Sequence, residues 1–103
     1  MDLSLTRICP SDAVPAGELR QFKVGDNELL IVNSAGRLLC LAARCTHAGA
    51  PLVEGELSGD VLTCPWHGSR FKVTDGSVVR GPAERALKTY NCQVQAGYLL
   101  AEI

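Results

Sequence analysis

Two short stretches contain both histidines of the chain, and each histidine lies close to a cysteine. His47 follows Cys45 by two positions, and His67 follows Cys64 by three. Thiolate sulfur and imidazole nitrogen are the side-chain donors that zinc and iron centres prefer. Two such pairs in one chain therefore indicate a metal site built from Cys45, His47, Cys64 and His67.

The order of these four residues bears on which metal they hold. Two cysteines and two histidines can close a tetrahedral zinc site, but the common zinc finger places both cysteines before both histidines. Here the order is Cys, His, Cys, His. Such interleaved pairs suit a centre with two metal atoms, in which two sulfurs hold one atom and two nitrogens hold the other. A structural zinc site remains the alternative.

The residues around the two pairs carry a resemblance to a known family. Residues 45–52 read CTHAGAPL and residues 64–71 read CPWHGSRF. These stretches resemble the two cluster-binding loops of the Rieske family, and GPAERALKTY (81–90) is similar to the segment that follows them there. The resemblance implies one Rieske 2Fe–2S cluster, with both cysteines on one iron and both histidines on the other. It also implies that the surroundings of the cluster include Gly49, Trp66, Gly68, Ser69, Phe71 and Pro82.

The implied ligand set has a consequence for the reduction potential. Two ferric ions, two sulfides and two thiolates sum to zero charge, whereas four thiolates would leave a negative cluster. Neutral imidazoles therefore make reduction easier and raise the potential above that of a four-cysteine cluster. We expect the histidine-bound iron to accept the electron and its ligands to lie nearest the surface.

Two departures from the respiratory branch of the family refine this expectation. Ala50 and Trp66 stand where that branch has a further pair of cysteines, so its disulfide is not expected here. Ser69 matches a serine whose hydroxyl bonds to the cluster in that branch, but Phe71 stands where the branch has a tyrosine. With one of two donors missing, we expect a potential at the low end of the Rieske range, about −150 mV.

Short strand-like runs separated by turn-forming residues predict the scaffold that must position these residues. No long window has a helical period, although there is room for a single helical turn near 82–86 and for a short hairpin within 48–63. The fold class is therefore all-β, and the resemblance implies a Rieske fold of small packed antiparallel sheets with two cluster-binding loops in a single domain over 1–103. The expected strands are 3–8, 19–24, 28–33, 37–42, 60–64, 70–73, 77–80, 87–95 and 98–103.

Composition and charge exclude several classes of function. The formal net charge is −1, so the chain does not have the excess of basic residues that is typical of a nucleic-acid binder. No run approaches the roughly 20 apolar residues that span a bilayer, and the N-terminus does not resemble a secretory signal. We therefore expect a cytoplasmic protein, whose five cysteines favour metal ligation over disulfides. Of the cysteines outside the two pairs, Cys40 and Cys92 are expected to be buried apolar side chains, and Cys9 has no metal-binding context.

The resemblance implies an electron carrier with no catalysis of its own, because the cluster uses both histidines and no nucleotide-binding fingerprint is present. We expect a monomeric ferredoxin of an aromatic-ring-hydroxylating dioxygenase system. It would take single electrons from an NAD(P)H-dependent flavin reductase and dock its histidine end on a terminal Rieske oxygenase. The alternative within the family is the small subunit of an assimilatory nitrite reductase.

The charges around the expected site are mixed. Three cations and three carboxylates lie within or beside the two stretches, and from their number we expect no strong electrostatic steering of partners. They are Arg44, Arg70, Lys72, Glu54, Glu56 and Asp60.

Overall fold

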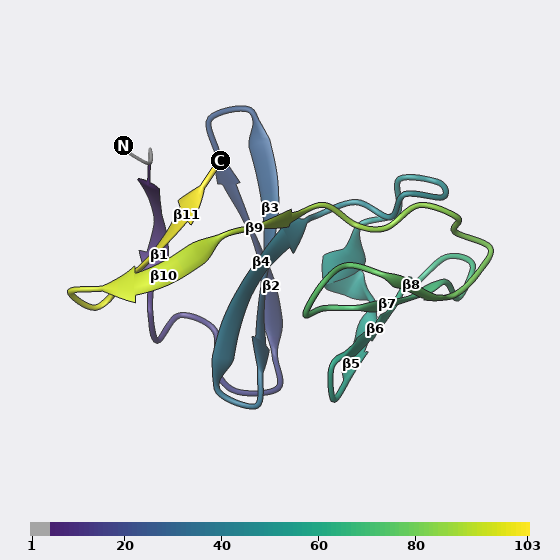
Figure 1. Ribbon diagram of the computed structural model, residues 1–103, viewed down its shortest axis with the longest axis horizontal. Coiled ribbons are helices and arrows are strands. Elements are labelled where there is room, and N and C mark those ends of the chain that lie inside the picture. The colour runs from purple at the N-terminus through teal and green to yellow at the C-terminus, as the bar shows by residue number, and fades with distance from the viewer. Residues whose placement is uncertain (1–4) are drawn as a thin grey trace.

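The computed structural model describes residues 5–103, which form three small antiparallel sheets (Figure 1). The first sheet has the order β1 (Leu5–Pro10), β11 (Tyr98–Glu102) and β10 (Cys92–Gln95). The second has the order β2 (Leu19–Val24), β3 (Asn27–Ser34), β4 (Arg37–Ala42) and β9 (Thr89–Tyr90). The third has the order β5 (Glu56–Ser58), β6 (Val61–Thr63), β7 (Arg70–Lys72) and β8 (Val78–Arg80).

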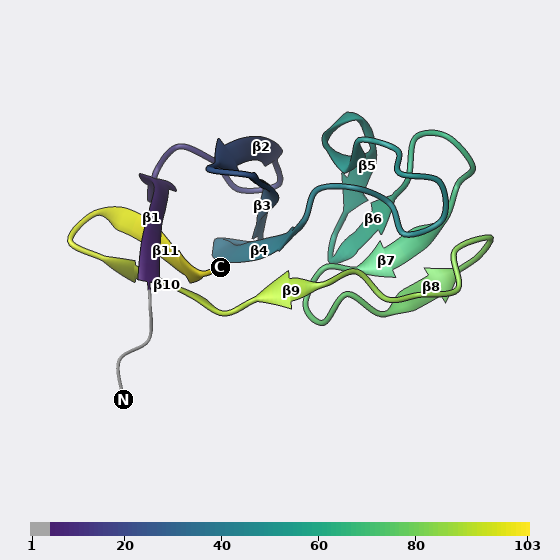
Figure 2. The same ribbon diagram turned by 90° about the horizontal axis from the view of Figure 1, so that it is seen from above.

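The three sheets follow one another along an elongated molecule of 38 × 26 × 21 Å. Both ribbon views place the second sheet in the middle, the first sheet at one end and the third sheet at the other (Figures 1 and 2). A short 3₁₀ turn, η1 (Leu52–Glu54), precedes β5. The third sheet and both candidate metal-binding stretches therefore lie at the same end of the molecule (Figures 1 and 2).

The middle sheet is buried on both of its faces, which explains the uninterrupted apolar run LLIV at 29–32. Side chains alternate along a strand, so Leu30 and Val32 pack toward the third sheet, whereas Leu29 and Ile31 pack toward the first. In β4 the same alternation sends Cys40 toward the first sheet. Two cores therefore share the middle sheet, and only the one on the side of the third sheet includes residues of the metal-binding stretches.

The expected strands agree with the structure except at a few places. Residues 3 and 4 of the first expected strand lie outside the described residues. The expected strand 87–95 is wrong as one element, because the chain leaves β4 at Asn91 and joins β11 in the first sheet. Residues 82–86 form no helical turn, since buried Ala83 and Leu87 anchor that segment to the core in an extended path. The expected hairpin is present as β5–β6.

The cysteines outside the two pairs lie together at the core between the first and middle sheets. Cys40 is buried, as predicted, whereas Cys92 is only partly buried and its thiol donates to the carbonyl of Leu38 at 3.6 Å. Cys9 is buried in the same core. Among residues 5–103, no helix is long and apolar enough to cross a membrane.

Candidate metal centre

Two loops built on the same plan hold the four candidate ligands. The first loop (residues 43–51) follows β4, and the second loop (residues 64–69) connects β6 to β7. In each, the cysteine amide donates to the carbonyl five positions later, from Cys45 to Ala50 at 2.9 Å and from Cys64 to Ser69 at 2.7 Å. Each loop is therefore closed at its base, and the histidine lies at its turn.

A glycine in the left-handed region precedes the closing residue of each loop. Gly49 has φ 75° and Gly68 has φ 76°. A Cβ at either position would meet no atom of the chain within 4 Å. The backbone conformation, rather than lack of space, therefore requires glycine at the position four residues after each cysteine.

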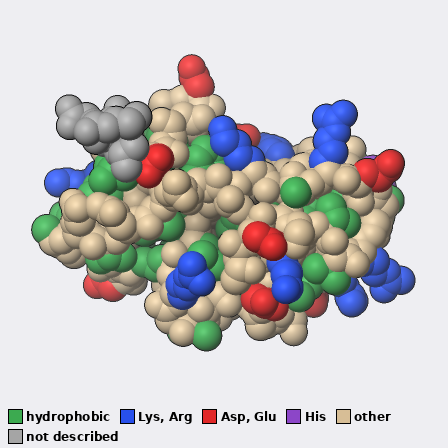
Figure 3. Space-filling model, viewed as in Figure 1, with side chains coloured by type: hydrophobic (Ala, Val, Ile, Leu, Met, Phe, Trp, Pro, Cys, Tyr) green, Lys and Arg blue, Asp and Glu red, His purple; other side chains and the backbone are tan. Residues whose placement is uncertain are grey.

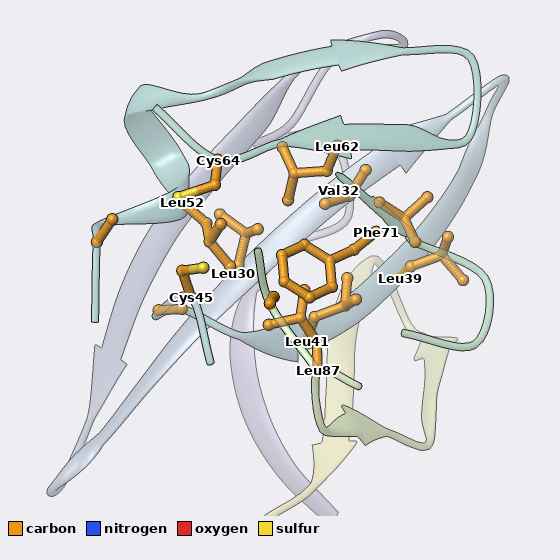
Figure 4. Packing of buried hydrophobic residues seen from close by; sticks show 14 residues of the cluster. Leu30, Val32, Leu39, Leu41, Cys45, Leu52, Leu62, Cys64, Phe71 and Leu87 are labelled. Atoms are coloured by element: carbon orange, nitrogen blue, oxygen red, sulfur yellow. The ribbon is translucent and has the colours of Figure 1, made fainter. Parts of the chain in front are cut away.

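The two loops bring like donors together. Cys45 and Cys64 belong to the same buried core, and their sulfurs lie at one edge of it (Figure 4). The rings of His47 and His67 meet edge to face, with centroids 4.9 Å apart and an interplanar angle of 83°. The site thus consists of a pair of sulfurs beside a pair of imidazoles.

The two pairs differ in their exposure. Each cysteine is only 3% exposed, whereas both histidines are exposed. Burial raises the pKa of the Cys45 thiol, although the nearby backbone amides of His47 and Ala48 act in the opposite direction. The sulfur side of the site is therefore dry and close to backbone amides, and the nitrogen side meets solvent.

A third segment, residues 81–88, holds both loops in place. The amide of Ala83 donates to the Ser69 hydroxyl oxygen at 2.9 Å, and the Thr46 hydroxyl donates to the Arg85 carbonyl at 2.6 Å. The segment begins with a cis Gly81–Pro82 bond. Sequence reasoning missed Thr46, because nothing in the position between Cys45 and His47 indicates a partner 39 residues away.

The other residues expected around the cluster lie in different surroundings. Ser69 and Phe71 are fully buried, and the Phe71 ring packs in the core that also contains both cysteines (Figure 4). Trp66 is 55% exposed beside His67, so it does not cover the site by packing within the loop. Pro82 is exposed, next to the Ala83 that bonds the second loop.

The donor set fits a two-iron cluster. A tetrahedral zinc site needs all of its donors around a single point. Two sulfurs side by side and two nitrogens side by side match instead the division of ligands between the irons of a 2Fe–2S cluster in which two histidines replace two cysteines.

Comparisons with known proteins agree with this chemistry. Residues 4–91 match the family described as Rieske [2Fe-2S] domain. The chain is 31% identical, over 98% of its length and 94% of the relative, to the biphenyl 2,3-dioxygenase ferredoxin component of Rhodococcus jostii. A ferredoxin of Sphingomonas yanoikuyae B1 has the same fold, with a TM-score of 0.92, 26% identity and coverage of 97% of this chain and 99% of that one.

A further structural match comes from a complex. It is the complex of reduced oxygenase and oxidized ferredoxin in carbazole 1,9a-dioxygenase, matched with a TM-score of 0.86, 29% identity and coverage of 93% of this chain and 99% of that one. Other relatives are longer. The chain is 32% identical to the cytochrome b6-f complex iron-sulfur subunit of Chlorobaculum tepidum over 91% of its own length, but it spans only 51% of that protein.

Proposed function

The chain belongs to the Rieske 2Fe–2S family, and from this premise we propose that it carries single electrons from a flavin-dependent, NAD(P)H-oxidising reductase to a terminal Rieske oxygenase. The family implies one 2Fe–2S cluster per chain. The role is supported by the relatives of similar length, which are ferredoxin components of oxygenase systems. The carbazole dioxygenase match supports the direction of transfer, because there a ferredoxin is in complex with an oxygenase.

One observation carries the proposal for the site: the buried sulfur pair lies beside the exposed imidazole pair. In our assignment, Cys45 and Cys64 hold one iron, and His47 and His67 hold the other. When bound, the cluster supplies one-electron redox chemistry. The buried cysteines keep water from the sulfur side, and the exposed rings let a partner approach the histidine end.

The chain would act as a carrier and not as a catalyst, because its two histidines are assigned to the cluster and its relatives of similar length are ferredoxin components. We further propose that it works as a monomer in the cytoplasm, where its five cysteines stay reduced. We also propose that residues 1–103 form a single domain.

The test combines the purified chain with the reductase and terminal oxygenase of a biphenyl dioxygenase system. We expect a red-brown protein with the electron paramagnetic resonance signal of mixed nitrogen and sulfur ligation, which NADH and the reductase reduce and the oxygenase reoxidises in stopped-flow traces. A colourless protein that contains zinc would contradict the cluster. A loaded protein that stays in a permanent stoichiometric complex with another enzyme would instead support the role of a bound subunit.

A further inference from the structure

The third sheet has a face that points away from the core. Leu57, Leu62 and Phe71 from β5–β7 pack inward, so their neighbours along the strands point outward. This outer face is made by Glu56, Ser58, Val61, Thr63, Arg70, Lys72, Val79 and Arg80. Figure 3 shows basic and acidic side chains over the end of the molecule that carries this sheet.

Strand register arranges the charges of the outer face in a row. Glu56 pairs with Thr63, Thr63 with Arg70, and Arg70 with Arg80. The row therefore runs from the carboxylate of Glu56 at the β5 edge to the guanidinium groups of Arg70 on β7 and Arg80 on the β8 edge. The register shift between Arg70 and Phe71 leaves Val79 beside them, 53% exposed. Two cations thus flank an exposed apolar side chain.

Among residues 5–103, Arg70 and Arg80 have no ion-pair partner. In the part of the chain that the structure describes, the ion pairs are Arg20–Glu18 and Arg44–Glu28. Arg44, which is next to the first candidate ligand, is thus neutralised by Glu28 at 3.1 Å. Like charges directly opposite each other destabilise a sheet. The Arg70–Arg80 pair therefore costs the fold some stability and leaves two charges available to another molecule.

The outer face is continuous with the metal-binding stretch. A groove of about 340 Å³ is lined by Glu56, Ser58, Val61, Thr63, Arg70 and Val79. A second groove of about 340 Å³ shares Glu56 and Thr63 with the first and extends to Cys64 and Pro65. A partner seated in the first groove would therefore lie close to the second loop.

We propose that the outer face of β5–β8 is a docking surface for an acidic region of the protein that exchanges electrons with this chain, with Arg70 and Arg80 as its charged contacts and Val79 as its apolar contact. This inference rests on the proposed function and names the chemistry of the partner. Charge complementarity selects an acidic occupant, because no carboxylate among the described residues forms an ion pair with either arginine. The count of mixed charges predicted no steering, whereas the register separates Glu56 on β5 from Arg70 on β7 and Arg80 on β8.

The first test measures binding of a fluorescent decaglutamate peptide to the cluster-loaded protein at low salt by fluorescence anisotropy. We expect Arg70→Gln/Arg80→Gln to weaken binding by roughly threefold or more, because the variant loses two charges whose attraction to the peptide is only weakly screened at low salt. The matched control is Lys23→Gln/Arg37→Gln, which removes two exposed cations from the middle sheet. No binding by the original chain, or an equal loss in both double variants, overturns the proposal.

The second test measures how fast the dithionite-reduced protein gives one electron to ferricyanide, a trianion, or to tris(phenanthroline)cobalt(III), a trication. Each oxidant accepts one electron, forming ferrocyanide or the cobalt(II) complex. We expect Arg70→Gln/Arg80→Gln to slow the first reaction and accelerate the second, again by roughly threefold at low salt. A changed potential or a damaged fold would move both rates in the same direction, and that result overturns the proposal, as do unchanged rates.

The proposal requires both results, and its failure is distinct from failure of the proposed function. Visible absorption and electron paramagnetic resonance report whether each variant holds the cluster. If the original chain does not hold the cluster, the proposed function is contradicted, whether or not the chain binds the decaglutamate peptide. If the protein holds its cluster, and its oxidation rates and peptide affinity do not change when Arg70 and Arg80 are replaced, only the docking surface is contradicted. The single variants Arg70→Gln and Arg80→Gln replace the double variant if it does not fold, with each expected to show a smaller shift of the same sign.

Discussion

The backbone amide of Ala83 donates a hydrogen bond of 2.9 Å to the hydroxyl oxygen of Ser69, and both residues are buried. The bond ties the second loop to the third segment, so Ser69 has a structural role whether or not a cluster is present. A hydroxyl that accepts one hydrogen bond still has its own proton to donate. Ser69 is therefore able to serve the loop and a cluster sulfide at once.

Replacing Ser69 by Ala should have two separable effects. The buried amide of Ala83 loses its acceptor, so urea titration should show a loss of about 1–3 kcal/mol in the free energy of unfolding. The reduction potential should fall by tens of millivolts, since about 1.4 kcal/mol corresponds to roughly 59 mV for one electron. The exposed Ser58→Ala is the control and should change neither. An unchanged potential in loaded Ser69→Ala would limit this residue to its structural role.

Phe71→Tyr should raise the potential by tens of millivolts. The fully buried Phe71 ring shares its core with Cys45 and Cys64, and a hydroxyl donating to a sulfur would stabilise the more negative reduced cluster. Protein-film voltammetry measures the shift. Should the variant lose stability with its potential unaltered, the new hydroxyl lies among apolar side chains without a partner, and the assignment of this position is wrong.

His47→Cys and His67→Cys should each abolish the spectrum of mixed nitrogen and sulfur ligation, because a thiolate would replace one imidazole on the proposed histidine-bound iron. Electron paramagnetic resonance of the reduced protein measures this, and iron and sulfide analysis reports whether a cluster is still present. Trp66→Phe, beside His67 but outside the proposed ligand set, is the control and should keep the signal. A normal spectrum in either histidine variant would remove that histidine from the ligands.

Gly76→Ala should be far more damaging than Gly25→Ala. Both glycines have positive φ, at 77° and 61°, but a Cβ at Gly76 would overlap the carbonyl oxygen of Leu87, whereas one at Gly25 meets open space. We expect a loss of about 1–2 kcal/mol for Gly25→Ala from the backbone alone. Crowding adds about 1–3 kcal/mol at Gly76. If both variants lose the same free energy in thermal or urea unfolding, the segment 81–88 moves away from a Cβ at Gly76 without a measurable loss of stability.

Cys40 should make the protein less stable at alkaline pH. Burial, with smaller contributions from Cys92 and Cys9, raises the pKa of its thiol from 9.0 to about 12. Between these values the unfolded chain releases the proton and the folded chain keeps it, so stability falls as pH rises, by at most about 1.4 kcal/mol per pH unit. Cys40→Ala should lose this component. Urea unfolding at about pH 8 and pH 10 measures it, and identical slopes in both proteins would contradict it.

Much of the fold followed from patterns local in the chain. The strand-like runs 28–33, 70–73, 77–80 and 98–103, separated by turns such as Asp75-Gly76, all predicted strands, because side-chain pattern and turn chemistry act over a few residues. The helical turn for which 82–86 had room is absent, since burial of Ala83 and Leu87 against distant strands decides the path there. Long-range pairing of β1 with β11 had no local signal at all.

By itself, the sequence determined the chemistry of the site: two cysteine–histidine pairs at this spacing, each with a glycine four residues after its cysteine, carry the family's ligand pattern wherever they lie. Only the tertiary structure decided how the two loops meet, with His47 edge to face against His67 and the segment 81–88 bonded across both loops. It also decided which charges are free, because pairing depends on strand register and on contacts between residues far apart in the chain. Arg44 forms an ion pair with Glu28, whereas Arg70 lies opposite Arg80 in the sheet.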